Sequence, residues 1–336
     1  MHADALDYRL PSELIAQHAA EPRDSARLLV YDRRHGAVRH RRFRDLPAEL
    51  DPSDLIVVND TRVLPVRVRT RRESGGAAEV LLLEPRGDAG DWEALVRPYR
   101  RLRIGETLRA GDLAITIVER LGEGRALVRP AAPSSLEAAL ERVGEMPLPP
   151  YIGAPLDDPS RYQTVYARAG GSAAAPTAGL HFTSRLWQEV RARHDVRPIT
   201  LDVGLDTFRP LSTDIVEQHP IHSERYHVPA ATADAVTRAL GDGRRVVAVG
   251  TTTVRVLETV FGQPRAPLEG RTRLLITPGH RFRATSAMIT NFHLPRSTLL
   301  AMVMAFAGVE QTRDLYRTAV SERYRFYSFG DATLIL

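Results

Sequence analysis

Two patterns of apolar positions divide the chain. From residue 180 onward, short apolar runs alternate with segments in which apolar residues recur at helical spacing. Such alternation of strands and helices is typical of a mainly parallel α/β body. The strands are expected over residues 199–203, 244–250, 274–278 and 287–292, and the helices over 184–194, 233–240, 253–261, 297–308 and 314–323. Ser297 has the side-chain oxygen expected of a helix N-cap.

Residues 55–145 have a different pattern. Short β-rich runs are separated every 8–15 residues by Gly, Asp or Pro, which is typical of a small antiparallel barrel or sandwich, and a helix is expected over 134–143. We therefore predict an α/β fold class, in which a barrel-like α/β main domain (residues 1–67 and 149–336) carries an inserted small antiparallel β-barrel domain (residues 68–148).

The composition excludes several kinds of chemistry. Of 336 residues 43% are hydrophobic, and the longest apolar stretch, 299–308, is too short to span a bilayer. The acidic N-terminus lacks the apolar core of a signal peptide, so a cytoplasmic protein is expected. The absence of cysteine excludes thiolate nucleophiles, zinc–thiolate sites and iron–sulfur clusters. The absence of lysine excludes Schiff-base and Walker A chemistry.

All 46 basic residues are arginines, and the net charge is +5. The arginines gather in three segments, 23–44, 62–72 and 97–103. Because guanidinium groups suit phosphates and base stacking, these clusters indicate a polyanionic partner, with a merely solvated surface as the alternative. The candidates for RNA binding are Arg97, Arg100, Arg101 and Arg103.

The segment VAVGTTTVRVLE has the most distinctive local pattern. A buried strand ends at Gly250, three threonines follow, and a helix begins. The free N–H groups and partial positive charge of a helix N-terminus suit a carboxylate or phosphate. Thr251, Thr252, Thr253 and Arg255 are therefore candidate ligand-binding residues, and an ordinary threonine N-cap is the alternative.

Three histidine-bearing segments lie near expected element ends. HPIHSERYH (219–227) contains His219 and His222 at a spacing that could ligate a metal ion, but Pro220 interrupts any helix, and acid–base residues in a loop are the alternative. His181 follows the small-residue segment 167–179, which is expected to be a long loop. His293 and Asn291 follow the last expected strand.

The segment LDVGLDTF (201–208) is similar to the glycine-rich loop of S-adenosylmethionine methyltransferases. Asp206 and Phe208 occupy positions where that loop needs glycine to approach its ligand. A methyltransferase of this type is therefore not expected.

Longer strings resemble one family from end to end, the S-adenosylmethionine:tRNA ribosyltransferase-isomerases of queuosine biosynthesis. They include LIVVNDTRVLPVRV (55–68), GEMPLPPYI (144–152), AAPTAGLHFT (174–183), HSERYHV (222–228), VGTTTVRVLE (249–258), ITNFHLPRSTLL (289–300) and ERYRFYSFGDATLIL (322–336). Asn59 and Asn291, the two asparagines of the chain, both lie within such strings.

The resemblance implies an activity in which S-adenosylmethionine, as co-substrate, donates its ribosyl carbons. The acceptor is 7-aminomethyl-7-deazaguanine at the wobble position of a tRNA, and the products are epoxyqueuosine-tRNA, adenine and methionine. It also implies an α/β barrel-like domain with an inserted β-barrel, and no metal. We expect a monomer that binds no membrane.

The resemblance also implies positions for the site. His222 and Glu224 are the expected proton-transfer groups, and Thr251–Thr253 with Arg255 are expected to hold the methionine carboxylate. The catalytic set is His222, Glu224, His181 and Asp202; the substrate-binding set is Thr177, Gly179, Thr251, Thr252, Thr253, Arg255, Asn291, His293 and Tyr226.

The chain departs from the family pattern LHVGxGTF at two positions. Asp202 stands where the family has histidine, and Asp206 stands where it has glycine. Aspartate tolerates the left-handed region better than most residues, so Asp206 is predicted at φ > 0. Two other functions stay open from the sequence: a non-catalytic RNA-binding protein, and a metal-dependent hydrolase that uses His219 and His222.

Overall fold

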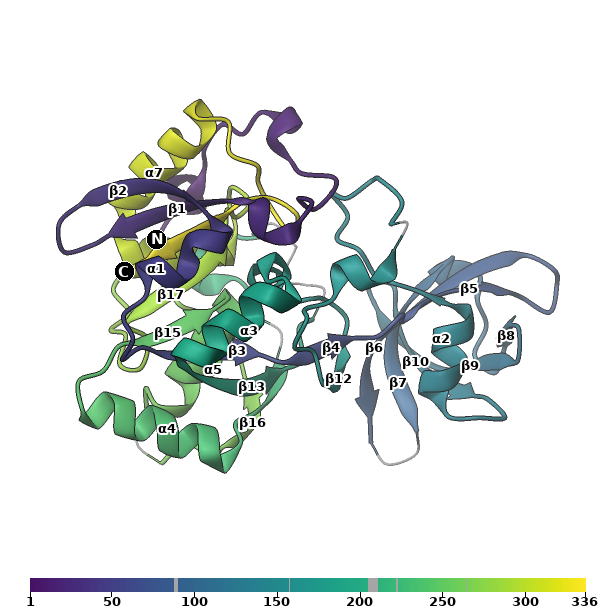
Figure 1. Cartoon of the computed structure of the whole chain (residues 1–336). Helices are drawn as coiled ribbons and strands as arrows, with labels where there is room; N and C mark the ends of the chain where they lie inside the picture. Colours follow the sequence, from purple (N-terminus) through teal and green to yellow (C-terminus); the bar gives the residue numbers. More distant parts are fainter. Residues whose placement is uncertain (88–89, 157, 205–210, 222, 264) are drawn as a thin grey trace. The chain divides into compact units, whose positions relative to one another are not determined.

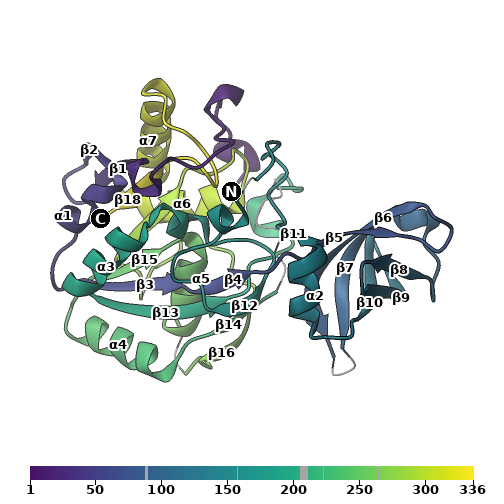
Figure 2. The same cartoon turned by 45° about the vertical axis from the view of Figure 1, so that its right-hand side comes forward.

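The structure, a computed structural model, describes residues 1–87, 90–156, 158–204, 211–221, 223–263 and 265–336. The chain divides into two compact units (Figures 1 and 2). The first contains residues 1–61, 150–169 and 175–336, and the second contains 62–149 and 170–174. The second unit thus begins before the boundary expected at residue 68 and also includes a short segment from beyond residue 149.

A nine-stranded mixed sheet forms the centre of the first unit, in the order β16-β14-β13-β3-β15-β17-β18-β1-β2. The neighbours β13, β3, β15 and β17 are parallel, and antiparallel pairs lie toward both edges. The strands are β1 (Arg27–Asp32), β2 (Ala37–Arg42), β3 (Leu55–Asn59), β13 (Asp195–Leu201), β14 (Glu224–His227), β15 (Val246–Val249), β16 (Glu269–Thr272), β17 (Ala287–Asn291) and β18 (Ala332–Ile335). All residues of β3, β15 and β17 are buried, as continuous apolar runs in parallel sheets require.

Helices cover both faces of this sheet, and α3 and α4 lie on opposite sides of β3 and β13 (Figures 1 and 2). The helices of this unit are α1 (Leu46–Glu49), α3 (Ser184–Arg193), α4 (Ala230–Gly241), α5 (Thr251–Val260), α6 (Thr298–Ala307) and α7 (Val309–Ser321). Ser297 caps α6 as predicted, since its side chain accepts a hydrogen bond from the Leu300 amide at 3.2 Å. Among the described residues, no helix combines the length and apolar content that crossing a membrane requires.

The second unit is a closed antiparallel barrel. Six strands follow in the order β5-β6-β7-β10-β9-β8, and β8 returns to β5 through the pair Arg71 and Arg109. The strands are β5 (Arg67–Arg71), β6 (Ala77–Arg86), β7 (Asp91–Arg97), β8 (Thr107–Ala110), β9 (Leu113–Gly122) and β10 (Arg125–Ala131), with a short β11 (Gly144–Glu145) beside β5 and one helix, α2 (Leu136–Val143). The predicted fold class, α/β with an inserted small antiparallel barrel, is confirmed. The main domain was expected to be barrel-like, and in the described residues its large mixed sheet is open, with β16 and β2 at the two edges.

Two local predictions are wrong. Residues 274–278 form no strand, because Leu274 is held by side chains: its amide donates to the Thr272 hydroxyl and its carbonyl accepts from Arg255. The strand in this region is β16, which ends at Thr272. The segment 167–179 is not a simple loop, since it contains β12 (Ala169–Ser172), paired with β4 (Thr61–Val63), and the start of the 3-10 helix η7 (Thr177–His181).

Candidate active site

The turn from β15 into α5 supplies the first part of the site. Gly250 has φ 92° and ψ 150°, a region open essentially only to glycine, so the chain can turn sharply into the helix. The Thr253 hydroxyl is buried and donates to the Val249 carbonyl at 2.7 Å, so it supports the turn. Thr251 and Thr252 instead line two cavities, beside the positive end of the helix.

The first cavity, here called the Arg255 cavity, combines one cation with an apolar wall. Its lining comprises Gly204, His219, Pro220, Ile221, Glu224, Thr251, Thr252, Arg255, Leu274, Leu275, Ile276, Thr298, Leu299 and Met302. The structure thus brings Glu224, Arg255 and two of the predicted threonines together. Glu224 lies on β14, and the other three residues lie on α5. Two elements that are distant in sequence therefore meet at this cavity of the first unit.

Two contacts fix the Arg255 guanidinium. Nη1 donates to Glu224 Oε2 in an ion pair, and Nε donates to the Leu274 carbonyl at 3.1 Å. Glu224 in turn accepts from the Gly204 amide at 2.9 Å. Nη2 of Arg255 is buried and has no hydrogen-bond partner in the part of the chain that the structure describes. A buried cationic N–H group without a partner suits an anionic ligand oxygen.

The second cavity, here called the Asn291 cavity, shares Thr251, Thr252 and Leu299 with the first. The rest of its lining is Ala175, Pro176, Thr177, Ala178, Val203, Gly250, Thr290, Asn291 and His293. Predicted residues from two segments therefore meet here, Thr177 from one and Asn291 and His293 from the other. The Asn291 amide nitrogen donates to the Tyr327 carbonyl at 3.1 Å, and its oxygen accepts from the Thr177 hydroxyl at 3.0 Å.

His293 presents a neutral imidazole to this cavity. Burial lowers its pKa from 6.5 to about 3, so the ring carries no charge at neutral pH. Nε2 lies 2.7 Å from the Thr290 hydroxyl. The backbone of His293 is held in place as well. The His293 amide donates to the Tyr316 hydroxyl at 3.0 Å, and the His293 carbonyl accepts from the Tyr8 hydroxyl at 2.6 Å. His293 is thus suited to hydrogen bonding rather than to supplying a positive charge.

Asn59, which the sequence analysis left without a role, holds the framework of the site. Its amide nitrogen donates to the Leu201 carbonyl at 3.0 Å and to the Thr252 hydroxyl at 3.3 Å, and its oxygen accepts from the Leu201 and Thr61 amides. The side chain is fully buried. It therefore joins the ends of β3 and β13 to the start of α5. The scarcity of asparagine in the chain was the one sequence signal that pointed to it.

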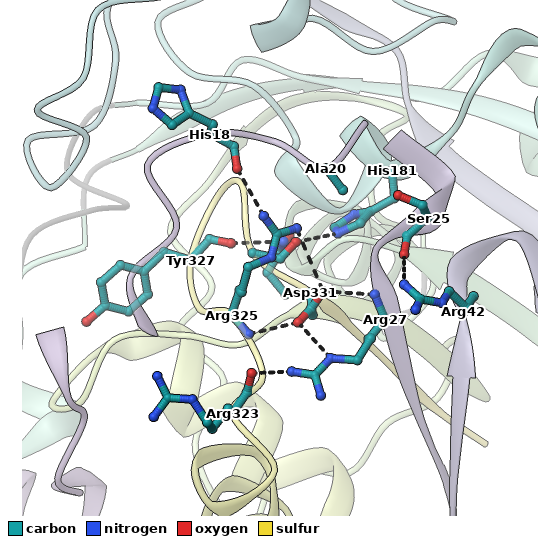
Figure 3. A network of polar contacts seen from close by, with 12 residues as sticks. His18, Ala20, Ser25, Arg27, Arg42, His181, Arg323, Arg325, Tyr327 and Asp331 are labelled. Carbon is teal, nitrogen blue, oxygen red and sulfur yellow. Dashed lines mark hydrogen bonds and ion pairs between the residues drawn. The ribbon is translucent and has the colours of Figure 1, made fainter. Parts of the chain in front are cut away.

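The structure places His181 outside both cavities. Its ring is buried, stacks on Phe43 with centroids 4.9 Å apart, and lies between the Ala178 and Gly330 carbonyls at 3.2 and 3.1 Å. Burial lowers its pKa. Figure 3 shows it beside a network centred on buried Asp331, which accepts from the backbone amides of Arg27 and Arg325 at 2.8 Å each. These contacts are those of a packing residue.

Gly179 and Tyr226 also lie outside the lining of the two cavities. A side chain at Gly179 would collide with the Tyr166 hydroxyl, 2.0 Å from the position of its Cβ, so glycine is required for packing. The Tyr226 hydroxyl donates to the Pro267 carbonyl at 3.0 Å. Both residues support the neighbouring segments.

Asp202 lies at the end of β13, next to Val203 and Gly204 of the cavity walls. Its carboxylate accepts from the Thr61 hydroxyl at 3.3 Å. Burial, and to a smaller degree the charge of Glu224, raise the pKa of this carboxyl group. A carboxyl group that holds its proton to higher pH than usual is suited to proton transfer.

Two predicted residues lie outside the described residues: His222, expected to transfer protons, and Asp206, expected at φ > 0. Of the two histidines considered as metal ligands, only His219 is among the described residues, and it lines the Arg255 cavity. The described residues contain no group of three or more possible ligands that could hold a metal ion.

The arginines predicted to bind RNA lie together in the barrel. Arg97 ends β7, and Arg100, Arg101 and Arg103 belong to the connection to β8; all four are exposed. No acidic side chain in the described part of the chain forms an ion pair with any of them. Elsewhere in the barrel, by contrast, Arg62, Arg69, Arg72, Arg86, Arg125, Arg129 and Arg142 are paired with carboxylates.

Fold and site together define a class: an α/β protein with an inserted β-barrel, whose cavities adjoin the carboxyl end of a parallel strand, where ligands of such sheets bind. The model of the family described as "Queuosine biosynthesis protein" matches residues 3–335. The chain belongs to this family, as the sequence resemblance predicted.

Relatives at high identity carry one name, S-adenosylmethionine:tRNA ribosyltransferase-isomerase. The protein of that name from Symbiobacterium thermophilum is 51% identical, and the alignment covers 100% of both chains. That from Rubrobacter xylanophilus is 52% identical, over 100% of this chain and 98% of the relative. The crystal structure of the S-adenosylmethionine tRNA ribosyltransferase from Thermotoga maritima is similar with a TM-score of 0.58 at 36% identity, covering 99% of this chain and 100% of that one.

Proposed function

We propose that this protein is a transferase that moves and isomerises the ribosyl group of S-adenosylmethionine onto a tRNA in queuosine biosynthesis. The acceptor is the aminomethyl group of a 7-deazaguanine at the wobble position. The ribose loses its bonds to adenine and to sulfur, and its carbons end on the acceptor nitrogen. The products are epoxyqueuosine-tRNA, adenine and methionine, and the chemistry as proposed uses no metal ion.

The observation that carries the proposal is the pairing of a fixed, partly unpartnered guanidinium with a helix N-terminus in one cavity. The buried Nη2 of Arg255 and the first-turn N–H groups of α5 suit the methionine carboxylate. The apolar wall of the Arg255 cavity, from Ile221 to Met302, suits the uncharged parts of the same molecule.

The reaction needs a base for the proton at C5′, next to the sulfonium, and a donor that helps adenine leave. Glu224, His222 and Asp202 remain the proposed proton-transfer groups, and each such group contributes typically ~10²–10⁴-fold. The raised pKa of Asp202 supports it as one of them. The ion pair of Glu224 supports a second role, the orientation of Arg255. His293 is proposed as a neutral hydrogen-bonding group.

The tRNA is proposed to contact the exposed arginines of the β7–β8 connection, because no acidic side chain among the described residues forms an ion pair with them. We propose that the protein is a monomer and that it acts in the cytoplasm. The monomeric state is tested by size-exclusion chromatography with light scattering at the enzyme's working concentration.

The activity is tested by incubating the protein with S-adenosylmethionine and tRNA that carries the 7-aminomethyl-7-deazaguanine base. We expect adenine and methionine to appear in equal amounts, only when both substrates are present. Release of S-adenosylhomocysteine, or no consumption of S-adenosylmethionine, would overturn the proposal. A non-catalytic RNA-binding protein gives the second of these results.

A further inference from the structure

The hydrogen bonds of the Asn291 side chain have a fixed direction. One partner of the Asn291 side chain is the Tyr327 carbonyl, which can only accept a hydrogen bond. The side-chain atom that faces this carbonyl must therefore be the donating Nδ2. The other atom, Oδ1, therefore faces Thr177 at 3.0 Å, and Oδ1 can only accept. Consequently the single proton of the Thr177 hydroxyl is committed to Asn291.

The backbone of Tyr327 keeps this chain of bonds in place. Tyr327 has φ 71°, a left-handed conformation that a bulky residue adopts only when its surroundings impose it. Its amide donates to the Phe292 carbonyl at 3.0 Å, and its carbonyl also accepts from the Gly330 amide at 2.9 Å. Figure 3 shows Tyr327 among the polar contacts beside Asp331. The carbonyl that orients Asn291 is therefore tied to the strand that carries Asn291.

Thr177 is the end of this chain that a ligand can reach. It is partly exposed and lines the Asn291 cavity, whereas Asn291 is buried. With its proton committed, the Thr177 oxygen offers only lone pairs to the cavity. We infer that Thr177 is a specificity-determining residue that acts as an acceptor only, and that it recognises a hydrogen-bond donor on the co-substrate.

This inference rests on the proposed function, in which the cavity holds S-adenosylmethionine. Three kinds of donor on that molecule could meet Thr177: the 6-amino group of adenine, the α-ammonium group, and the ribose hydroxyls. Removing any one of these donors would leave the Thr177 oxygen facing the bound ligand without a partner, and such a loss typically weakens binding about tenfold or more.

The test measures dissociation constants by calorimetry for S-adenosylmethionine and for analogues in which hydrogen replaces one donor at a time. In the wild type, one analogue should bind at least about tenfold more weakly than S-adenosylmethionine. In Thr177→Val, which keeps the shape and removes the acceptor, that ratio should fall to near one. Thr177→Ser keeps the hydroxyl and should keep the ratio.

Asn291→Leu provides a second route. It frees the Thr177 proton, so the hydroxyl can donate as well as accept, and an analogue with a hydrogen-bond acceptor in place of the recognised donor should be penalised less in this variant than in the wild type. Thr237→Val, on the exposed side of α4, should leave every dissociation constant unchanged. Because the readout is a ratio within each variant, a general loss of folding or affinity does not produce it.

An unchanged ratio in Thr177→Val for every analogue would overturn the inference while leaving the proposed function intact. Failure of the wild type to bind S-adenosylmethionine at all would instead count against the proposed function. The analogue whose ratio collapses identifies the donor that Thr177 recognises.

Discussion

Arg255 and Glu224 form the central contact of the site at the scale of single residues. Because Glu224 holds Nη1 of Arg255, we expect Glu224→Gln to loosen the guanidinium and weaken binding of S-adenosylmethionine by about tenfold. Because Glu224 is also a proposed proton-transfer group, the rate at saturation should fall by ~10²-fold or more. The measurements are the dissociation constant and the single-turnover rate, with the exposed Glu310→Gln as the matched control.

Each of the two proposed roles can be contradicted separately. A weaker affinity with a nearly unchanged saturated rate would contradict proton transfer by Glu224, and a ~10²-fold lower saturated rate with the affinity of the wild type would contradict its role in orienting Arg255. The two results separate orientation of Arg255 from acid–base catalysis.

Asp202 makes folding stability depend on pH. Its pKa is raised in the folded protein, so the folded state binds the proton more tightly than the unfolded state. The cost of ionising Asp202 is therefore absent below the ordinary pKa of aspartate and grows as pH rises through the folded pKa. We expect Asp202→Asn to raise the melting temperature at pH 7 and to lose this benefit toward pH 3.8. The exposed Asp234→Asn should show no such trend; an equal effect at both pH values would contradict this explanation.

The sequence was informative about which residues lie near the site and less so about their roles. The threonines of α5, Arg255, Asn291 and His293 could be located because their types and their position after a strand indicate ligand binding. Histidine at an element end, however, does not reveal which way its ring points, and the ring of His181 packs on Phe43. The ion pair of Glu224 joins residues on β14 and α5, so no local pattern could predict it.

The turn between β15 and α5 is the element on which the site depends. Gly250→Ala places a Cβ in a backbone region nearly closed to other residues, and we expect a loss of about 1–3 kcal/mol in unfolding free energy. Gly241→Ala is the matched control, since it lies in α4 with nothing within 4 Å of the added Cβ. It should be neutral or stabilise by up to about 1 kcal/mol. Denaturant unfolding measures both, and equal effects would contradict the assigned role of the turn.

Periodicity predicted most elements of the α/β unit because buried parallel strands read as continuous apolar runs. It failed at residues 274–278, where an apolar run lines the Arg255 cavity instead of joining the sheet. An apolar run reports burial, and burial against a cavity wall and burial within a sheet look alike in sequence. The strand β16 was missed for the complementary reason, because its residues, EGRT, are mostly polar.

At the scale of the whole molecule, the barrel insertion was readable from the change in spacing of β-rich runs. The ion pairs of the barrel's arginines could not be predicted from the sequence, because partners such as Arg62 and Glu141 are far apart along the chain. Such ion pairs distinguish Arg62, Arg69 and Arg142 from the exposed arginines of the β7–β8 connection. Charge clusters in the sequence alone could not make this distinction.

Replacing Arg100, Arg101 and Arg103 with Gln should weaken tRNA binding and flatten its salt dependence by about 2 to 3 in the log–log slope, if each contacts a phosphate. The control triple replaces Arg62, Arg69 and Arg142, which carry the same total charge but are paired with carboxylates. Titrations of tRNA at several salt concentrations measure both. Equal losses in the two triples would mean that overall charge, and not the loop, governs binding.

The central claim, transfer of ribosyl carbons to the tRNA, is tested most directly by isotope tracing. S-adenosylmethionine labelled with ¹³C in the ribose is incubated with the enzyme and tRNA carrying the 7-aminomethyl-7-deazaguanine base, and the wobble nucleoside is analysed by mass spectrometry. We predict that all five labelled carbons appear in that nucleoside, while label in the S-methyl group does not. Methyl label in the tRNA, or ribose label remaining with adenine, would contradict the proposed reaction.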